Sequence, residues 1–293
     1  MRHLPLAAAL AALTNASVWG LSWIPLKYLE KQGVPSLWAT FFVFLLCSIA
    51  VIVARRSAPR ALWQNKALWW LVLAAGGTNA CFNIALAQGD VVRCILLFYL
   101  MPMWVVPLAR WLLNEPVTLA ALVRIALALA GASLVLGDGQ FIAPIPHSIP
   151  DWLAVAGGAF FALNNVILRK YNSTPEDARA LGMFLGAVVI APMTIFALSF
   201  TAHPMVLHAT PIAWLVILAF AVFVLIGNLA LQYGAGRLPA NVLSVLMLAE
   251  ILVATISSWL GGAATITGAT LIGGALIISA SLLAVFSKNP TPH

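Results

Sequence analysis

Residues 210 to 232 read TPIAWLVILAFAVFVLIGNLALQ, a run without a single charged side chain. An α-helix needs about 20 residues to cross roughly 30 Å of hydrocarbon, so this run is long and apolar enough to span a bilayer. Nine further runs have the same character. The ten predicted spans are roughly 5 to 28, 35 to 54, 67 to 88, 91 to 112, 119 to 137, 150 to 170, 179 to 200, 210 to 232, 239 to 260 and 266 to 286.

The composition excludes a water-soluble globule. The chain is 63% hydrophobic and 8% charged, with a mean hydropathy of +1.02, which leaves too little polar surface to coat a soluble domain. Unpaired backbone amides are costly in lipid, and the alternating ten-residue pattern of an outer-membrane barrel is absent from the sequence. We therefore predict an all-α polytopic membrane protein with ten transmembrane helices.

The net charge of +7 follows from how the basic residues are distributed along the chain. With the termini and the even-numbered connections on one side, twelve of the 15 basic residues fall on that side, among them Arg2 and Lys288. Only Lys27, Lys31 and Arg93 fall on the other. The positive-inside rule then predicts cytoplasmic N- and C-termini, and no nucleic-acid partner is needed to explain the charge.

The two halves of the chain match each other weakly but in order. Lys27-Tyr28 corresponds to Lys170-Tyr171, Asn83 to Asn228, and Trp111 to Trp259, at spacings that drift only from 143 to 148. We predict two five-helix repeats, residues 1–140 and 141–293, within one integrated transmembrane domain. Because five is odd, the repeats have opposite orientations, an arrangement typical of secondary transporters with a midplane substrate site.

Amides and aromatic residues identify the helices that should line a path. Spans 1, 3, 4, 6, 8 and 9 carry them, whereas spans 5 and 10 are almost wholly aliphatic and should be peripheral or pack on each other. An amide in lipid either joins helices by hydrogen bonds or contacts substrate, and the sequence leaves both open. The candidate substrate-binding residues are Trp19, Asn79, Asn83, Tyr99, Met101, Asn164, Asn228, Gln232, Ser244 and Met247.

Two further residues stand out at the same predicted depth. Pro102 interrupts an aromatic and thioether run in span 4, where it frees a backbone carbonyl and predicts a hinge. Glu250, its repeat partner, is the one acidic residue deep inside a predicted span. A carboxylate there is a coupling-proton site, a partner for a substrate ammonium group or a buried structural hydrogen bond. By contrast, Glu115, beside Pro116 at the start of span 5, reads as helix-start chemistry without a catalytic role.

The sequence contains no Walker loop, GxSxG, HExxH or Cys/His cluster. We therefore expect no enzyme activity, no cofactor and no metal, and we expect transport to be driven by a gradient.

The chain resembles the drug/metabolite transporter superfamily and its EamA-type exporters. The resemblance rests on the ten spans in two halves, the run from Asn15 to Gly20, the segment from Pro102 through Trp111 to Glu115 and Thr118, and the Gly131-Ala-Ser-Leu-Val segment. The resemblance covers essentially the whole chain. In the second half, Gly261-Gly262-Ala263-Ala264 replaces the glutamate that such proteins often repeat. Within the superfamily the chain is most similar to aromatic amino-acid exporters, which implies a central cavity lined by helices 1, 3, 4, 6, 8 and 9.

The expected function is an alternating-access exporter of small amphipathic metabolites, with aromatic amino acids as the leading substrates. The amides would bind the polar groups, and Trp19, Tyr99, Met101 and Met247 would receive the side chain. The alternative is an exporter of hydrophobic cations or drugs, with Glu250 as the counter-charge or proton site. The partners in either case are a small molecule and the lipid bilayer.

Overall fold

The computed structural model describes residues 6–137, 145–200, 206–262 and 265–286. Within these ranges, ten helical segments are long and apolar enough to cross a membrane, which confirms the predicted all-α polytopic class. The helices are α1 (Leu6–Leu21), α2 (Trp23–Lys31), α3 (Ser36–Ala54), α4 (Ala58–Gln64), η1 (Lys66–Leu68), α5 (Trp69–Gln88), α6 (Val91–Phe98), α7 (Met101–Leu113), α8 (Leu119–Leu136), α9 (Ile149–Lys170), α10 (Glu176–Leu198), α11 (Pro211–Arg237), α12 (Ala240–Met247), α13 (Ala249–Leu260) and α14 (Gly268–Phe286). The predicted repeat boundary at residue 140, like Arg2 and Lys288, lies outside the described residues.

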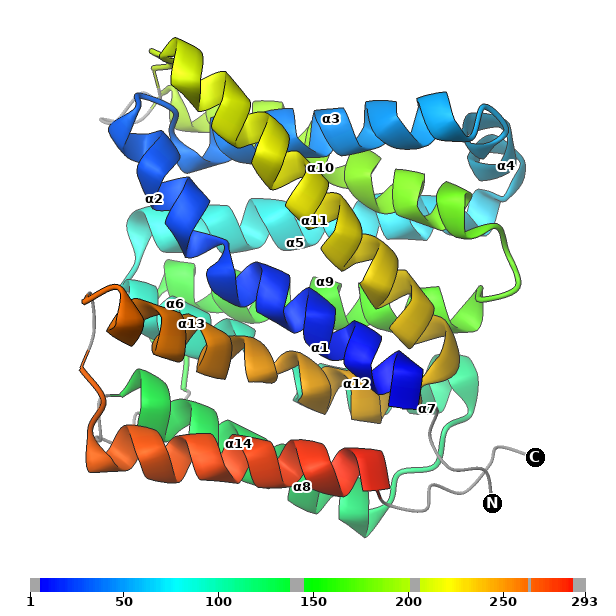
Figure 1. The fold of residues 1–293 in the computed structure, drawn as a ribbon. Helices are drawn as coiled ribbons and strands as arrows, with labels where there is room; N and C mark the ends of the chain where they lie inside the picture. Colours follow the sequence, from blue (N-terminus) through cyan, green and yellow to red (C-terminus); the bar gives the residue numbers. More distant parts are fainter. Residues whose placement is uncertain (1–5, 138–144, 201–205, 263–264, 287–293) are drawn as a thin grey trace.

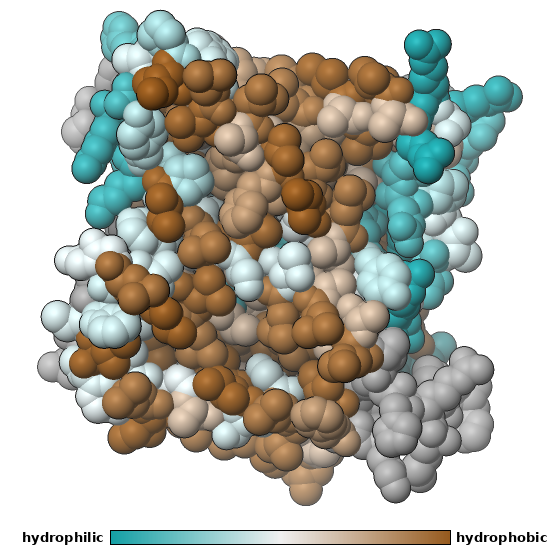
Figure 2. All heavy atoms as spheres, in the orientation of Figure 1, coloured by the Kyte–Doolittle hydropathy of each residue, from teal (hydrophilic) through white to brown (hydrophobic). Residues whose placement is uncertain are grey.

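The bundle has two distinguishable ends. α1 begins and α14 ends on the same side, together with α4, whereas α2 and α13 end on the opposite side (Figure 1). We call these the terminal end and the far end. Hydrophobic side chains cover the middle of the visible face and hydrophilic ones gather at its two edges (Figure 2), which is the surface a membrane-spanning bundle needs.

The eighth span continues to Arg237, beyond its predicted limit near 232, because the helix buries Gln232 inside the bundle. The connection between α3 and α5 contains the short helix α4. There, Pro59 occupies the first turn, where a proline is tolerated, and Leu62 is buried at 3% exposure, which gives this short helix an anchor.

Three of the spans are broken near their middle. α1 passes into α2 at Ser22, α6 into α7 at Tyr99 and Leu100, and α12 into α13 at Leu248. Leu100 and Leu248, the residues that precede α7 and α13, are 148 positions apart, the same spacing that separates Trp111 from Trp259. The fourth and ninth spans are therefore interrupted at equivalent places, which supports the repeat hypothesis and creates helix ends inside the membrane.

The aliphatic helices α8 and α14 pack on each other at one edge of the bundle (Figure 1). Their contact is close, because a Cβ atom on Gly131 would lie 2.5 Å from the Gly273 carbonyl oxygen, and one on Gly273 would lie 2.6 Å from the Gly131 carbonyl oxygen. Only glycine allows the two backbones to approach so closely. These helices form part of the frame, as their composition predicts.

Candidate functional site

A cavity of about 420 Å³ lies inside the bundle, a size suited to one small organic molecule. All six helices that the sequence singled out contribute to it, corresponding to spans 1, 3, 4, 6, 8 and 9. Its wall is formed by Trp19, Gly20, Ser22, Trp23, Leu26, Phe44, Ala75, Thr78, Asn79, Phe82, Leu86, Ile95, Phe98, Tyr99, Leu136, Phe161, Asn164, Met183, Asn228, Leu231, Glu250, Ile251, Ala254 and Thr255.

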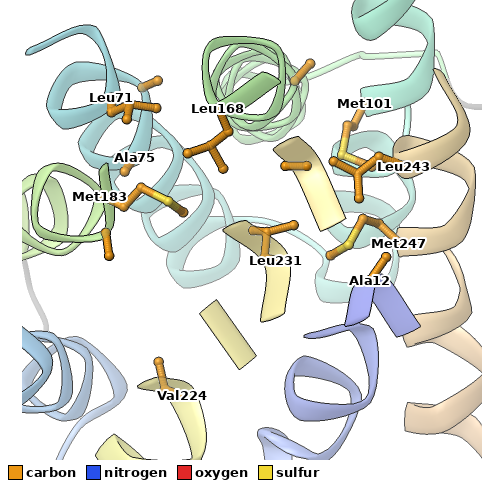
Figure 3. Packing of buried hydrophobic residues seen from close by; sticks show 14 of the residues in the cluster. Ala12, Leu71, Ala75, Met101, Leu168, Met183, Val224, Leu231, Leu243 and Met247 are labelled. Atoms are coloured by element: carbon orange, nitrogen blue, oxygen red, sulfur yellow. The ribbon is translucent and has the colours of Figure 1, made fainter. Parts of the chain in front are cut away.

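The cavity extends to the far end of the bundle, where Leu26 of α2 and Leu136, the last residue of α8, line it. Its floor is formed by Met183, seven residues after α10 begins, and Leu231, six residues before α11 ends. Below the floor, toward the terminal end, the interior is filled. Figure 3 shows Met101, Leu243 and Met247 close together beside Ala12, and all four side chains are at most 1% exposed.

Aromatic rings form much of the cavity wall. Phe98 is the centre of one group, with its ring centroid 4.5 Å from that of Phe82 and 5.7 Å from that of Phe161. Across the cavity, Trp19 stacks on Phe44 with centroids 6.3 Å apart. Such surfaces favour an aromatic or otherwise apolar part of a ligand.

Glu250 is the one ionisable carboxylate in the described lining, and that lining holds no Lys, Arg or His. It lies in the first turn of α13, just after the helix break at Leu248. Tyr99, at the equivalent break between α6 and α7, forms a side-chain hydrogen bond with it. The two interrupted helices thus each supply one member of a polar pair to the cavity. A helix N-terminus also favours negative charge, which suits the carboxylate.

Helix packing holds these breaks in position. A Cβ atom on Gly158 of α9 would lie 2.4 Å from the carbonyl oxygen of Phe98, and one on Gly20 of α1 would lie 2.7 Å from that of Glu250. The first helix of each half therefore packs on the broken helix of the other half. Both contacts depend on the missing side chain of a glycine.

The amides of the cavity differ in their bonding. Asn79 and Asn228 each donate to the backbone carbonyl one turn earlier, Ala75 at 2.9 Å and Val224 at 3.0 Å. Asn164 is 1% exposed, and within the described part of the chain neither its amide oxygen nor its amide nitrogen has a hydrogen-bond partner. Burying an unpaired amide is costly, so this side chain is the clearest ligand-binding group in the wall.

Six of the predicted site residues line the cavity, namely Trp19, Asn79, Tyr99, Asn164, Asn228 and Glu250. Asn83 lies one turn along α5 and donates to the Asn79 carbonyl at 2.7 Å without reaching the wall. Met101, Gln232, Ser244 and Met247 are buried in the packed layer below the floor. Pro102 lies in the first turn of α7, so the chain breaks just before it and the proline begins the second helix segment.

Three helices outside the six expected ones each add a single residue to the wall, namely Phe44, Leu136 and Met183. A phenylalanine, a leucine and a methionine in apolar helices carry no signal that separates them from lipid-facing neighbours. Trp23 also lines the cavity and donates from Nε1 to Ser257 Oγ at 2.9 Å. Among the described residues, no group of His, Cys, Asp or Glu could hold a metal ion.

A polar cluster at the terminal end joins several helices, although the sequence assigned its Glu115 only to a helix start. The Glu115 carboxylate accepts from the backbone N–H of Ala240 at 3.1 Å, and its Oε1 is 3.9 Å from Nε of Arg169. Arg169 Nη1 and Asn172 Nδ2 both donate to the Gly236 carbonyl, at 2.6 and 3.0 Å. Burial raises the pKa of the Glu115 carboxyl, while the Ala240 N–H and the Arg169 charge oppose that rise. Glu115, which precedes α8, therefore contacts a second helix, because its carboxylate accepts from the first residue of α12.

At the far end, Arg93 pairs with a residue that the sequence did not suggest. Its Nε lies 2.7 Å from Oδ2 of Asp151, at the start of α9. The nearby Asp90 caps α6 by accepting from the Arg93 backbone N–H at 2.8 Å.

A bundle of ten helices long and apolar enough to span a membrane, with an internal cavity that holds a carboxylate and several amides, is typical of a membrane transporter. Comparison with known families agrees, because residues 6–137 match the EamA-like transporter family. That match covers a little less than half of the chain.

Two individual proteins are similar over longer stretches. YyaM of Bacillus subtilis (strain 168), described as an uncharacterized transporter, is 27% identical over 206 residues. That match covers 67% of this chain and 66% of YyaM, just under two thirds of the relative. A crystal structure described only as that of a protein has a TM-score of 0.80, with 94% of this chain and 96% of that chain covered at 21% identity, which shows a shared fold.

Proposed function

We propose that this transporter exports small amphipathic molecules across the bacterial inner membrane, and that aromatic amino acids are its leading substrates. The observation that carries the proposal is the unpartnered Asn164 amide in the same cavity as Glu250 and an aromatic wall. A zwitterion with an aromatic side chain offers a complementary group to each of the three. The size of the cavity, about 420 Å³, suits such a molecule.

In this arrangement the substrate ammonium group binds the Glu250 carboxylate and its carboxylate accepts from the Asn164 amide. The aromatic side chain lies against Phe82, Phe98 and Phe161. An amide is a weaker partner for a carboxylate than an arginine would be, and this favours a carrier that releases its substrate readily. Asn79 and Asn228 supply further polar contacts.

Transport proceeds by alternating access, in which the two halves rock around the cavity. With the termini in the cytoplasm, as the distribution of basic residues predicts, the far end faces outward and the cavity is open to the outside. Met101, Gln232, Ser244 and Met247 then form the closed inner layer. They come to line the path only when the cavity faces the cytoplasm.

A hydrophobic cation is the second candidate substrate. The described lining contains one carboxylate and no basic side chain, so it complements a positive charge without needing a carboxylate on the ligand. In that case Glu250 is the counter-charge, or it exchanges the substrate for a coupling proton.

The two candidates are separated by a matched pair of variants in proteoliposomes. Uptake is measured for an aromatic amino acid and for the corresponding aromatic amine, with and without an imposed pH gradient. Glu250→Gln should reduce transport of both by at least about tenfold, because each loses its ammonium partner. Asn164→Leu should reduce amino-acid transport by a similar factor and leave amine transport nearly unchanged.

Three results decide the matter. Amine transport without amino-acid transport establishes the cation carrier. No transport of either compound by purified protein rejects the proposal. A rate that responds to the pH gradient in the parent but not in Glu250→Gln assigns proton coupling to that carboxylate.

A further inference from the structure

The polar cluster at the terminal end joins the two halves of the chain. Glu115, in the connection from α7 to α8, belongs to the first half, whereas Arg169, Gly236 and Ala240 belong to the second. We define the Glu115 latch as the Glu115 carboxylate, the Arg169 guanidinium, the Ala240 N–H and the Gly236 carbonyl. It links the ends of α7, α9 and α11 to the start of α12.

The contact of the latch with α12 replaces a missing cap. Pro239 precedes α12 and provides no side-chain hydrogen bond to its first turn, so the Ala240 N–H depends on Glu115. A carboxylate at a helix N-terminus is stabilised by the helix dipole and by a charge-assisted hydrogen bond. The Glu115 side chain is only 11% exposed, so solvent screens the contact weakly.

The latch covers the packed layer below the cavity floor. α12 carries Leu243, Ser244 and Met247, which fill the terminal half beside Met101 of α7 (Figure 3). Opening the cavity toward the terminal end requires this layer to separate. A bond from Glu115 to the first residue of α12 directly opposes that movement.

The equivalent positions at the far end lack this chemistry. Asn114, before Glu115, has a left-handed backbone with φ 55°, and Gly262, 148 positions later, has φ 69°. The same corner therefore follows the fourth and the ninth span. The residue after Gly262 is Ala263, which lies outside the described residues, and the position matching Arg169 is Leu26. At that end the sequence supplies neither the carboxylate nor the guanidinium.

The far end has its own ties, the Arg93–Asp151 pair and the Trp23–Ser257 hydrogen bond. Neither closes the cavity, which still reaches Leu26 and Leu136 at that end.

We propose that the Glu115 latch holds the terminal end closed and makes the arrangement open at the far end the resting state of this transporter. Glu115 is a positioning residue in this scheme and does not touch substrate. The relevance of the latch to transport rests on the alternating access proposed above. Its test follows conformation alone and needs no transported substrate.

The test uses single cysteines introduced into the protein in proteoliposomes, with Cys47, Cys81 and Cys94 replaced by alanine. Ser244→Cys reports on the buried layer near the terminal end, and Thr255→Cys reports on the cavity wall in the far half. The rate of modification by a small polar thiol reagent is measured at each site. Glu115→Ala should raise the rate at position 244 at least about fivefold and lower the rate at position 255.

Glu115→Gln is the matched variant, because it keeps an acceptor for the Ala240 N–H but loses the charge. Because burial raises the pKa of Glu115, the closed arrangement does not depend on the negative charge, so labelling of this variant should stay close to that of the parent. Should Glu115→Ala not fold, Glu115→Ser, whose short side chain does not reach the Ala240 N–H, and Asn172→Ala, which removes one bond to Gly236, carry the test. Rates of Glu115→Ala, or of Glu115→Ser in its place, within twofold of the parent at both sites overturn the proposal. A rise at both sites also overturns it, because that pattern shows general loosening.

This readout separates the latch from the proposed function. Opposite shifts at positions 244 and 255 support the latch even in a protein that moves no amino acid or amine. Unchanged labelling in a protein that does transport them rejects the latch alone.

Discussion

The terminal half and the far half of the bundle are built from the same spans but filled differently. Toward the terminal end, Leu168, Leu243 and Met247 are at most 1% exposed and pack into a continuous layer. Toward the far end, the same depth of protein contains a cavity of about 420 Å³ with Glu250 and Asn164 in its wall. The two ends of the bundle are therefore not equivalent, although the sequence predicts two related halves.

The difference between the two ends lies in their side chains and not in their backbone. The helix breaks at Leu100 and Leu248 and the left-handed corners at Asn114 and Gly262 recur at one spacing of 148, so the backbone plan is shared. The side chains after those corners are not shared. At the terminal corner Glu115 contacts Ala240 and Arg169, and by the mechanism proposed above this contact keeps that end closed.

The largest effect is expected from removing packing in the filled half. Leu168→Ala should lower the free energy of unfolding by about 2–5 kcal/mol, because Leu168 is fully buried and its neighbours cannot all move into the space. Leu86→Ala makes the same chemical change in the cavity wall, where one side of the leucine already faces empty space. It should cost much less. Unfolding in detergent, followed by circular dichroism, measures both, and equal losses would contradict the contrast between the halves.

The next effect concerns the helix break that places Tyr99. Gly158→Ala puts a Cβ atom 2.4 Å from the Phe98 carbonyl oxygen, so α9 must move away from the break. Overpacking of this kind costs about 1–3 kcal/mol. Gly268→Ala is the control, since no atom lies within 4 Å of a Cβ at that position. We expect a lower unfolding temperature for Gly158→Ala and an unchanged one for Gly268→Ala. Similar temperatures for the two variants would show that the helix break accommodates the added Cβ atom without loss of stability.

The smallest effect is a dependence of the resting state on pH. Burial raises the pKa of Glu115 above its ordinary value of 4.5 in the closed arrangement, whereas an opened terminal end would return it toward that value. The closed arrangement therefore binds the proton more tightly, so acid favours it. The stabilisation is complete below the ordinary value and is lost as the pH rises through the raised pKa.

Labelling of Ser244→Cys, corrected for the thiolate fraction at each pH, should thus slow on acidification by a few-fold at most. Of the described residues, only Arg169 adds a charge effect to this pKa, and Glu176 lies beside Arg179 and Arg237. Glu115→Gln isolates the Glu115 contribution and should remove the pH dependence. A parent protein whose corrected rate rises on acidification would contradict the assigned sign.

Much of the fold follows from the sequence because lipid imposes simple rules. Apolar runs of sufficient length become spanning helices, and the ten of them are present within a few residues of the expected limits. The six helices that line the cavity were identifiable from Glu250, the amides and the aromatic residues, since lipid disfavours buried polar groups. Local composition carries that information.

The conformation is not encoded in such local signals. Met101, Gln232, Ser244 and Met247 have the same residue types as the cavity wall but lie in the closed layer, because the relative position of the two halves decides which of them face open space. Glu115 looked like an ordinary helix start, since its partner Ala240 is 125 positions away and contributes only a backbone N–H. Long-range contacts with the backbone leave no pattern in the chain.

The left-handed corner at Asn114, with its glutamate, has a consequence for how much substrate the cell must accumulate. A site that rests facing outward is available to cytoplasmic substrate only in the minor fraction of molecules that have turned inward. If that fraction were about one in a hundred, the apparent affinity from inside would be roughly a hundredfold weaker than the intrinsic affinity. Such a protein would transport slowly at ordinary internal substrate concentrations and faster only when its substrate accumulates.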